Sequence, residues 1–528
     1  MPQSPRLARD EFDAWKARAR EGWFDPHLAS LIRWHGHAGA EPALRAFADA
    51  CAGPVDAWAR NTNRDENLPR LYRWDDIGNR TEEVAHHPDH HEIGKVVWGS
   101  GIMSRYGTPG RELETLGLLY LLAQDGEGGH CCPLACTAGM IRILQASPDS
   151  PRAWLERLLD PDYARRWHAS QFLTEVQGGS DVGANAVIAR PAADGWWEIT
   201  GEKWFCSVID AKLFLLTARP EGAPPGTGGL RAFVVPRELD GRPNGFEIRR
   251  LKYKLGTRSM ASAEVDFVAA RGWPVAEFRK VMELVLNTSR LYNAVCAAGF
   301  LQRAWREADA YARARTAFTQ PILGFPIIAR VVARLKTEAY AARATSFLLA
   351  AHETHDEAWR MLVNLNKIWT ATTCPAGVRD AIEVLGGNGA IEEFSVLPRL
   401  LRDSIVLEAW EGGHGVLCNQ LLKDSRRGMH APMFDWLERL GGHPRLAEVR
   451  ARWERVVAHP RGEAHVRDVV EELRPIAQAA VLLAESRAAG SDPLLPVIAE
   501  HLVVTNARGW DPLADEGLEE RVARINAA

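Results

Sequence analysis

The segment AWEGGHG, residues 409–415, places Glu411 between a tryptophan and two glycines, at the end of a helical pattern. A glutamate on an exposed surface needs no such neighbours. A carboxylate that must face a bound ligand would benefit from the apolar wall of Trp410 and from the small residue Gly412. Spacing alone leaves two interpretations of Glu411 open, a helix-end acid and an acid–base group at a ligand site.

A glycine-rich segment, QFLTEVQGGSDVGANA (residues 171–186), could bind an anionic ligand. Gly178 and Gly179 leave the main-chain N–H groups uncrowded, and Thr174 and Ser180 add hydroxyl donors. Such a loop can hold a pyrophosphate or the edge of a flavin, although a plain glycine-rich turn has the same composition. The segment is not the G-x-G-x-x-G fingerprint of dinucleotide-binding folds.

Two further clusters attract attention but are given less weight. HHPDHHE (residues 86–92) has the ligand types of a metal site, yet no second ligand cluster follows, so we interpret it as a helix entry with Pro88 in the first turn. No metal is expected. The vicinal Cys131 and Cys132 in GHCCPLACT are interpreted as packing residues and not as redox thiols.

The elements that must position these residues follow a clear order. Helical patterns fill residues 1–165, and β-forming runs separated by Gly, Pro and Asp turns follow in residues 166–275. Long amphipathic helices then predict a bundle in residues 276–430, and a helical extension occupies residues 431–528. The predicted fold class is α+β, with an N-terminal helical domain, a central antiparallel β domain, a C-terminal helical bundle and an extra helical extension.

One detail of the β domain concerns the candidate site directly. Only Gly201 and Glu202 separate the runs GWWEIT and KWFCSV. This spacing predicts a tight hairpin, which would place Trp197, Trp204 and Ser207 on neighbouring strands.

Composition excludes several classes of protein. Of the 528 residues 46% are hydrophobic, and 64 basic residues nearly balance 68 acidic ones, so no global field favours nucleic acid or anionic lipid. Eight cysteines without C-x-x-C spacing indicate reduced, mostly buried thiols. The N-terminal segment lacks an apolar signal core, and no apolar run is long enough to span a bilayer, so we expect a cytoplasmic protein.

Six segments together resemble the acyl-CoA dehydrogenase family. They are LTEVQGGSDV, GEKWFCS, LKYKLGTRSMASAEVDF, YARARTAF, EVLGGNGAIEE and LRDSIVLEAWEGG, and they follow the family's order and spacing over residues 90–425. Within the family, these segments are most similar to the branch that contains the adaptive-response alkylation protein, whose members have an extra C-terminal helical domain.

The resemblance implies that FAD binds non-covalently between the β domain and the bundle. Thr174 and Ser207 would contact the isoalloxazine ring, and Ser180 would lie near the cofactor phosphates. Two departures from the family pattern are Thr319, where a glycine is usual, and Glu383, where a glutamine is usual. Further residues assigned to the cofactor are Trp204, Phe205, Arg315, Phe318, Gly386, Gly387 and Gly389, of which Arg315 and Phe318 would reach the FAD of a neighbouring subunit.

The same resemblance places Glu411 at the position of the catalytic base, which removes the α-proton of an acyl thioester while a hydride leaves Cβ for flavin N5. Because that proton is weakly acidic, the base needs a dry pocket that raises its pKa. Trp410 and Gly412 would line the substrate pocket, and Arg290 would tune the base. Some members have the base on another helix, where this chain has Ser289.

The expected function is therefore FAD-dependent α,β-dehydrogenation of an acyl-CoA or acyl-carrier thioester in fatty acid metabolism. An electron-transfer flavoprotein would be the electron acceptor, and the protein would form a homodimer or homotetramer. One alternative is a flavoprotein of the alkylation response that binds DNA, but residues 431–528 contain 12 arginines and no lysine against 16 acidic residues, which disfavours DNA. The other is a flavin-dependent monooxygenase or oxidase on the same fold.

Overall fold

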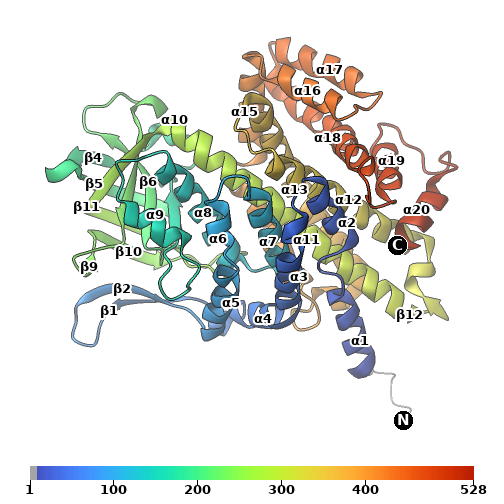
Figure 1. Cartoon of the computed structure of the whole chain (residues 1–528), viewed down its shortest axis with the longest axis horizontal. Helices are drawn as coiled ribbons and strands as arrows, with labels where there is room; N and C mark the ends of the chain where they lie inside the picture. The colour runs from blue at the N-terminus through green and yellow to red at the C-terminus, as the bar shows by residue number, and fades with distance from the viewer. Residues whose placement is uncertain (1–8, 528) are drawn as a thin grey trace.

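Helices form the N-terminal part of the chain and pack against the bundle that follows later in the sequence (Figure 1). The computed structural model describes residues 9–527. After its acidic first turn, helix α7 is apolar on all sides, and it packs between α3 and the long helix α11. A hairpin of β1 (Arg70–Trp74) and β2 (Arg80–Ala85), which the sequence did not predict, interrupts these helices. The helices are α1 (Arg9–Arg20), α2 (Pro26–Trp34), α3 (Glu41–Ala50), α4 (Asp56–Thr62), α5 (Pro88–Gly99), α6 (Ile102–Tyr106), α7 (Glu112–Ala123), α8 (Gly128–Gln145) and α9 (Arg152–Leu159).

A seven-stranded sheet forms the β domain, on the left in Figure 1. The path of the sheet is β10-β11-β5-β4-β6-β3, and β7 pairs with both β11 and β6. Most pairs are antiparallel, but β6 runs parallel to β3 and to β4. The strands are β3 (Ala169–Phe172), β4 (Ile188–Pro191), β5 (Trp197–Ser207), β6 (Leu213–Pro220), β7 (Arg231–Pro236), β10 (Phe246–Leu251) and β11 (Ser262–Glu277), and β8 (Glu238–Leu239) pairs with β9 (Arg242–Pro243) separately.

The predicted hairpin at Gly201 is wrong, because GWWEIT and KWFCSV belong to one continuous strand, β5. Gly201 has φ +138° and pairs with Phe267 of β11, so it bends the strand without reversing it. A two-residue type I′ turn needs positive φ at both central residues, and Glu202 does not have it. Trp204 and Ser207 therefore lie on the same strand as Trp197.

The bundle consists of long helices, as the period of the sequence predicts. Helix α11 contacts both α12 and α13 along its length, and a π-helical segment, Met282–Leu286, precedes it. The hairpin of β12 (Thr316–Ala317) and β13 (Gln320–Pro321) follows α11 at the end of the molecule opposite the β domain (Figure 1). The helices are α10 (Phe278–Val281), α11 (Asn287–Ala314), α12 (Pro326–Ala351), α13 (Glu357–Leu385), α14 (Leu397–Ala409) and α15 (His414–Arg426).

The C-terminal extension packs on the bundle and also reaches the N-terminal helices. The indole of Trp369 in α13 donates to the carbonyl of Val470 at 2.8 Å. Glu485 lies 3.0 Å from the imidazole of His27 and accepts from Ser30, so the two ends of the chain share a buried polar cluster. The helices are α16 (His430–Arg439), α17 (Leu446–Ala458), α18 (Gly462–Ser486), α19 (Leu495–Thr505) and α20 (Leu518–Ala527).

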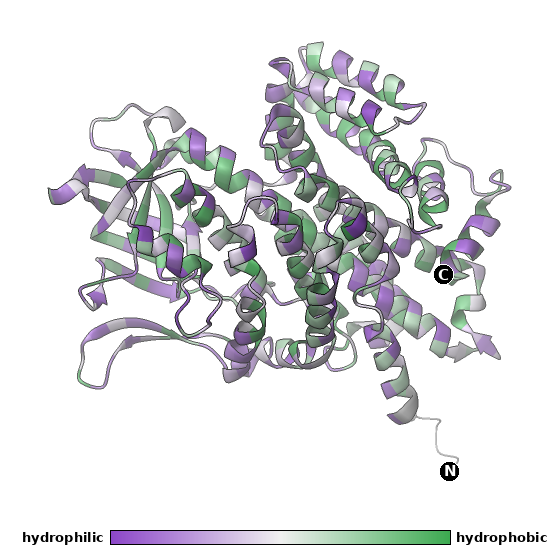
Figure 2. Cartoon of the chain, viewed as in Figure 1, coloured by the Kyte–Doolittle hydropathy of each residue, from purple (hydrophilic) through white to green (hydrophobic). Residues whose placement is uncertain are grey.

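Two apolar cores meet at one residue. One core runs through the N-terminal helices, the bundle and the extension, and a second fills the β domain. Figure 2 shows hydrophobic colour concentrated where the helical layers face one another. Trp410 packs against both cores, which fixes the segment that follows α14 at the boundary between them.

The cysteines are free and buried, as predicted. Across residues 9–527 no helix is both long enough and apolar enough to cross a bilayer.

Candidate active site

Glu411 lies directly after helix α14, at the boundary between the two cores. The helix ends at Ala409, and Trp410 already has extended backbone angles. Glu411 then has φ +59° and Gly412 φ +98°, so two consecutive residues adopt left-handed conformations. For a glutamate this conformation costs about 1 kcal/mol, and such strain concentrates at functional sites. The backbone thus presents the side chain in a direction that an ordinary helix end would not give.

Two buried cations hold this strained segment through its main chain. Arg290 of α11 donates from Nε to the carbonyl of Glu411 at 3.1 Å, and its Nη1 donates to the side-chain oxygen of Asn364 at 2.9 Å. Lys367 of α13 donates to the carbonyls of Glu408 and Gly412, both at 2.9 Å. Because neither cation pairs with the Glu411 carboxylate at hydrogen-bond distance, that group stays available to a ligand.

The electrostatics of Glu411 suit a base that works near neutral pH. The residue keeps part of its surface open, yet its carboxyl group is surrounded by protein, and this burial raises its pKa to about 7. The charges of Arg290 and Lys367 act in the opposite direction and keep the pKa from rising further. Burial also lowers the pKa of Lys367 to about 8. A glutamic acid in this setting can accept and release a proton at physiological pH.

Two thiols of helix α8 lie near Glu411. Cys132 and Cys136 lie one turn apart with their sulfurs 4.0 Å from each other. The hydrogen bond with Cys132, burial and the nearby Glu411 carboxylate all raise the pKa of the Cys136 thiol. The carbonyl of Cys136 also accepts from Gln171 at the start of the glycine-rich loop, so this loop and Glu411 border the same stretch of α8.

The alternative position for the base, Ser289, lies near the same place. It is buried on α11, and its hydroxyl donates to the amide oxygen of Gln171 at 3.4 Å. A serine cannot act as the carboxylate base, so Glu411 is the candidate that remains.

The glycine-rich loop is held in place by a buried ion pair. Lys203 of β5 contacts Glu175 at 2.7 Å, and Glu175 also accepts from the N–H groups of Ala186 and Val187. A Cβ at Gly179 would lie 2.6 Å from the hydroxyl oxygen of Thr174, so a glycine is needed at position 179 for the two residues to lie this close together. The sequence predicted the hydroxyls of this loop but missed the ion pair that fixes it.

Strand β5 brings further predicted residues to the same loop. The N–H of Trp204 donates to the carbonyl of Thr174 at 3.0 Å, which joins the strand to the loop. Ser207 ends the strand, and its hydroxyl lies 3.2 Å from that of Ser262 on β11. Phe205 is 51% exposed and Val176 of the loop is 52% exposed. Exposed apolar side chains next to hydroxyl donors, with Ser180 farther out on the loop, form a surface that a planar ring could cover.

A second group of predicted residues lies elsewhere in the chain. Arg315 and Phe318 belong to the hairpin at the far end of α11, and Phe318 is 88% exposed. The turn Gly386–Ala390 lies near that end, because the amide of Asn388 donates to the hydroxyl of Tyr311 at 3.4 Å. A Cβ at Gly386 or Gly387 would meet nothing within 4 Å, whereas one at Gly389 would clash with the backbone of Ile382. Within one chain, this group does not join Thr174, Ser207 and Glu411.

The histidine-rich segment forms a small pocket of about 240 Å³ between the N-terminal helices and the β domain. Pro88 occupies the first turn of α5, as predicted. His86 stacks on His90 at 4.0 Å, and Asp210 lies 3.4 Å from both His86 and His168. Within residues 9–527 no group of three or more His, Cys, Asp or Glu side chains is placed to bind a metal ion.

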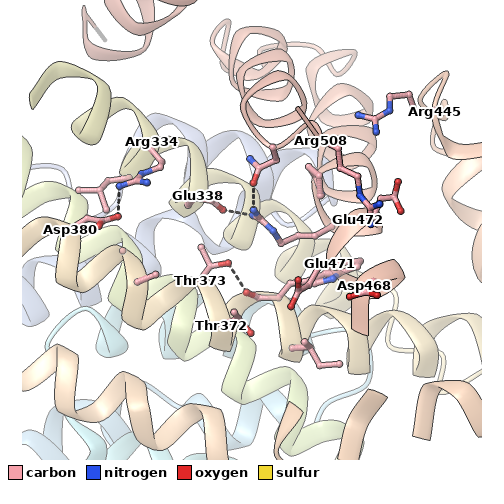
Figure 3. Close-up of a pocket in the computed structure, with 18 residues that line it drawn as sticks. Arg334, Glu338, Thr372, Thr373, Asp380, Arg445, Asp468, Glu471, Glu472 and Arg508 are labelled. Carbon is pink, nitrogen blue, oxygen red and sulfur yellow. Dashed lines mark hydrogen bonds and ion pairs between the residues drawn. The ribbon is translucent and has the colours of Figure 1, made fainter. Parts of the chain in front are cut away.

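A larger pocket of about 570 Å³ lies between α12, α13 and the extension (Figure 3). Its walls hold ion pairs such as Arg334 with Asp380 and Arg474 with Glu338, both at 2.6 Å. None of the predicted site residues lines it. We therefore place the candidate site at Glu411 and the neighbouring glycine-rich loop, on the residues described above.

Comparison with protein families gives matches along most of the chain. Residues 18–165 match the adaptive response protein AidB N-terminal domain, residues 170–269 the acyl-CoA dehydrogenase middle domain, and residues 272–425 the acyl-CoA dehydrogenase C-terminal domain.

Individual relatives agree with these matches. AidB of Escherichia coli (strain K12) is 31% identical over 392 residues, which cover 68% of this chain and 69% of that protein. Acyl-CoA dehydrogenase family member 11 of Caenorhabditis elegans is 27% identical over 413 residues, which cover 72% of this chain and 66% of that protein. The chain thus spans about two thirds of the length of these relatives.

Solved structures extend the likeness to nearly the whole fold. The structure described as Bd2924 apo-form has a TM-score of 0.81 at 26% identity and covers 92% of this chain and 99% of its own. The Caenorhabditis elegans ACDH-11 structure, in complex with C11-CoA, also has a TM-score of 0.81, at 23% identity, and covers 95% of this chain and 94% of its own. The likeness therefore includes the C-terminal extension.

Proposed function

Because this chain belongs to the acyl-CoA dehydrogenase family, a family of FAD-binding oxidoreductases, we propose that it removes two hydrogens from an acyl thioester to make an α,β-double bond. The observation that carries the proposal is the enclosed carboxyl of Glu411, which is held at a strained helix end with a pKa of about 7. A thioester α-proton needs a base of this kind in a dry site.

The residues of this chain divide the work among themselves. Glu411 accepts the α-proton, and Arg290 and Lys367 hold its backbone while their charges keep its pKa near neutrality. Trp410 packs against both apolar cores, and the carbonyl of Gly412 accepts a hydrogen bond from Lys367. The bound FAD would accept the hydride that leaves Cβ.

The chemistry of the loop and of strand β5 suits a flavin. Thr174 and Ser207 offer hydroxyls at the junction of loop and strand, and a Cβ at Gly178 would meet nothing within 4 Å. The half-exposed faces of Phe205 and Val176 give a ring an apolar surface to cover. Hydroxyl donors of this kind stabilise the negative charge that a flavin gains on reduction. Trp204 and Ser180 would complete the cofactor site.

The remote group of residues has a place in this proposal only in an oligomer. Arg315 and Phe318 are exposed in the segment around β12 and β13, at the end of the molecule opposite the β domain. These two residues, and with them Gly386, Gly387 and Gly389, could reach a flavin only if a second copy of the chain places its β domain beside them. A homodimer or homotetramer is therefore part of the proposal, with an electron-transfer flavoprotein as acceptor.

The decisive experiment is an anaerobic titration of the purified protein with acyl-CoAs of different chain length and branching. Loss of the visible flavin band with one acyl class is the expected result, and it would also identify the substrate class. The complex of ACDH-11 with C11-CoA makes medium-length chains a sensible first choice.

Other outcomes would point to other functions. A flavin that keeps its absorption with every thioester, but is oxidised rapidly by oxygen after chemical reduction, would indicate an oxidase or monooxygenase. Salt-dependent binding to duplex DNA would indicate the alkylation-response function, which the excess of acidic residues in the extension disfavours.

A further inference from the structure

Lys254 is a lysine of the β domain with an unusual environment. It lies in the segment between β10 and β11, where its ammonium donates to the carbonyl of Met260 at 2.9 Å and to the hydroxyl of Ser262 at 3.0 Å. Other lysines of this domain have carboxylate partners, Lys203 with Glu175 and Lys252 with Glu264, both at 2.7 Å. Within residues 9–527 no carboxylate lies within 4.0 Å of the Lys254 ammonium.

The ammonium and the Glu411 carboxylate both lie near helix α8. Burial lowers the pKa of Lys254 to about 8, and the groups that act against this are Cys132 of α8 and Asp403 of α14. The sulfur of Cys132 lies beside that of Cys136, and the nearby Glu411 carboxylate raises the pKa of the Cys136 thiol. Lys254 therefore lies near Cys132, and Glu411 lies near Cys136, one turn away on α8.

A chain of hydrogen-bonded groups connects Lys254 through Ser262 to Ser207. Ser262 pairs with Ser207 in the register of β11 and β5, and their oxygens are 3.2 Å apart. An ammonium group can only donate, so Ser262 accepts from Lys254 and is polarised to donate its own hydrogen to Ser207. The hydroxyl hydrogen of Ser207 is then free to be donated to a ligand beside the strand, such as the proposed flavin.

We propose that Lys254 is a positioning residue that orients the hydroxyl of Ser207 through Ser262 and so favours the reduced flavin over the oxidised one. The proposal rests on the proposed function, because it needs a flavin beside Ser207. Its chemistry is that of a hydrogen-bond chain that ends in a donor. Such a donor interacts more strongly with a ring that has gained negative charge, and the positive charge of Lys254 adds to this effect.

The test is the reduction equilibrium of the bound flavin, measured against a reference dye without any thioester. Lys254→Met keeps the length of the side chain and removes both charge and donor. We expect it to disfavour reduction by about tenfold, which is about 30 mV for a two-electron couple. Lys254→Arg, which keeps the charge and a donor, should recover part of the loss.

Ser262→Ala tests the chain itself. It leaves the lysine in place but breaks the connection, so it should shift the equilibrium in the same direction as Lys254→Met. If the two residues act through one chain, the double variant shifts the equilibrium no further than the larger single change. This variant also keeps the proposal testable if Lys254→Met does not fold.

Lys336→Met is the matched control. Lys336 is a buried lysine of α12 that donates to the carbonyl of Ile525, and burial lowers its pKa to about 8 as well. Its replacement should leave the flavin equilibrium unchanged. Flavin-bearing Lys254→Met and Ser262→Ala proteins with the equilibrium of the unmodified protein would overturn this inference and leave the dehydrogenase proposal intact, whereas an unmodified protein that binds no flavin would overturn both.

Discussion

Arg290 donates to the main-chain carbonyl of Glu411 at 3.1 Å and not to its carboxylate. A direct ion pair would hold the carboxylate ionised and occupied. The contact to the backbone fixes where the side chain begins, while the positive charge still lowers the pKa from a distance. The arginine thus positions and tunes the carboxylate without blocking it.

Replacement of this carboxylate should remove activity and spare the flavin. We expect Glu411→Gln to lower dehydrogenation by about 100- to 10,000-fold, because the amide cannot accept the proton. The measurement is single-turnover bleaching of the flavin by the best acyl-CoA. Glu408→Gln is the matched control, since Glu408 lies one turn earlier and its carboxylate contacts His414 at 3.0 Å. Equal rates for Glu411→Gln and the unmodified protein would place the base elsewhere.

The pH profile should follow the same carboxyl group. Activity is expected to rise as the pH passes through about 7, because the ionised form of Glu411 is the base. Removal of a nearby positive charge by Arg290→Gln raises the pKa and should move the midpoint upward by about one pH unit. Arg290→Lys, which keeps the charge, should move it less. A midpoint that stays in place or moves downward in Arg290→Gln would exclude the tuning role.

Glu411 should also make stability depend on pH. Its pKa is raised on folding, so the stability it contributes is complete below its unfolded value near 4.5 and is lost as the pH rises through about 7. Glu411→Gln lacks this loss. We expect its free energy of unfolding to exceed that of the unmodified protein by up to about 3 kcal/mol at pH 8, with a much smaller difference at pH 4. Urea unfolding at both pH values measures this, and a difference that does not grow with pH would contradict it.

The ion pair beneath the glycine-rich loop should be essential for flavin binding. Glu175→Gln leaves the ammonium of Lys203 buried without its partner, which we expect to cost about 3–5 kcal/mol. FAD retention on dilution and urea unfolding would both report the loss. Glu221→Gln is the control, because its pair with Arg190 is exposed and should contribute about 1 kcal/mol or less. Similar losses for both variants would argue against a special role for the buried pair.

The hairpin after α11 should tolerate, and gain from, a glycine. Phe318 and Thr319 both have positive φ, at +49° and +74°. Thr319→Gly removes strain from an exposed turn, so we expect a gain of about 0.5–1 kcal/mol in the free energy of unfolding. Thr316→Gly, in the paired strand of the same hairpin, should give no gain. A loss of stability in Thr319→Gly would show that the threonine has a contact that outweighs the strain.

The fold followed from patterns that act over short distances. The apolar period of residues 113–124 and of the long bundle helices was sufficient to predict α7, α11, α12 and α13. The hairpin at Gly201 could not be predicted correctly, because glycine allows both a turn and a bent strand. The choice was made by pairing with Phe267, a residue far away in the sequence.

The site was predictable to the extent that its residues lie in recognisable segments. Glu411 and the hydroxyls of the loop stood out by their neighbours, whereas Ser207 of the strand was assigned by the family resemblance. Lys367 did not, because a lysine in a long amphipathic helix is indistinguishable from a surface residue until its contact with Gly412 is known. The same holds for Lys254, whose role depends on the register that places Ser262 opposite Ser207.

The contact between His27 and Glu485 joins residues 458 positions apart in the chain. During synthesis, the N-terminal helices leave the ribosome long before Glu485 exists, so His27 and Ser30 cannot yet make their contacts with this carboxylate. Long-range contacts of this kind slow folding, because the chain must close a large loop before the contact stabilises it. We therefore expect the contact that seats α18 against α2 to form late, because α18 is among the last segments to be synthesised.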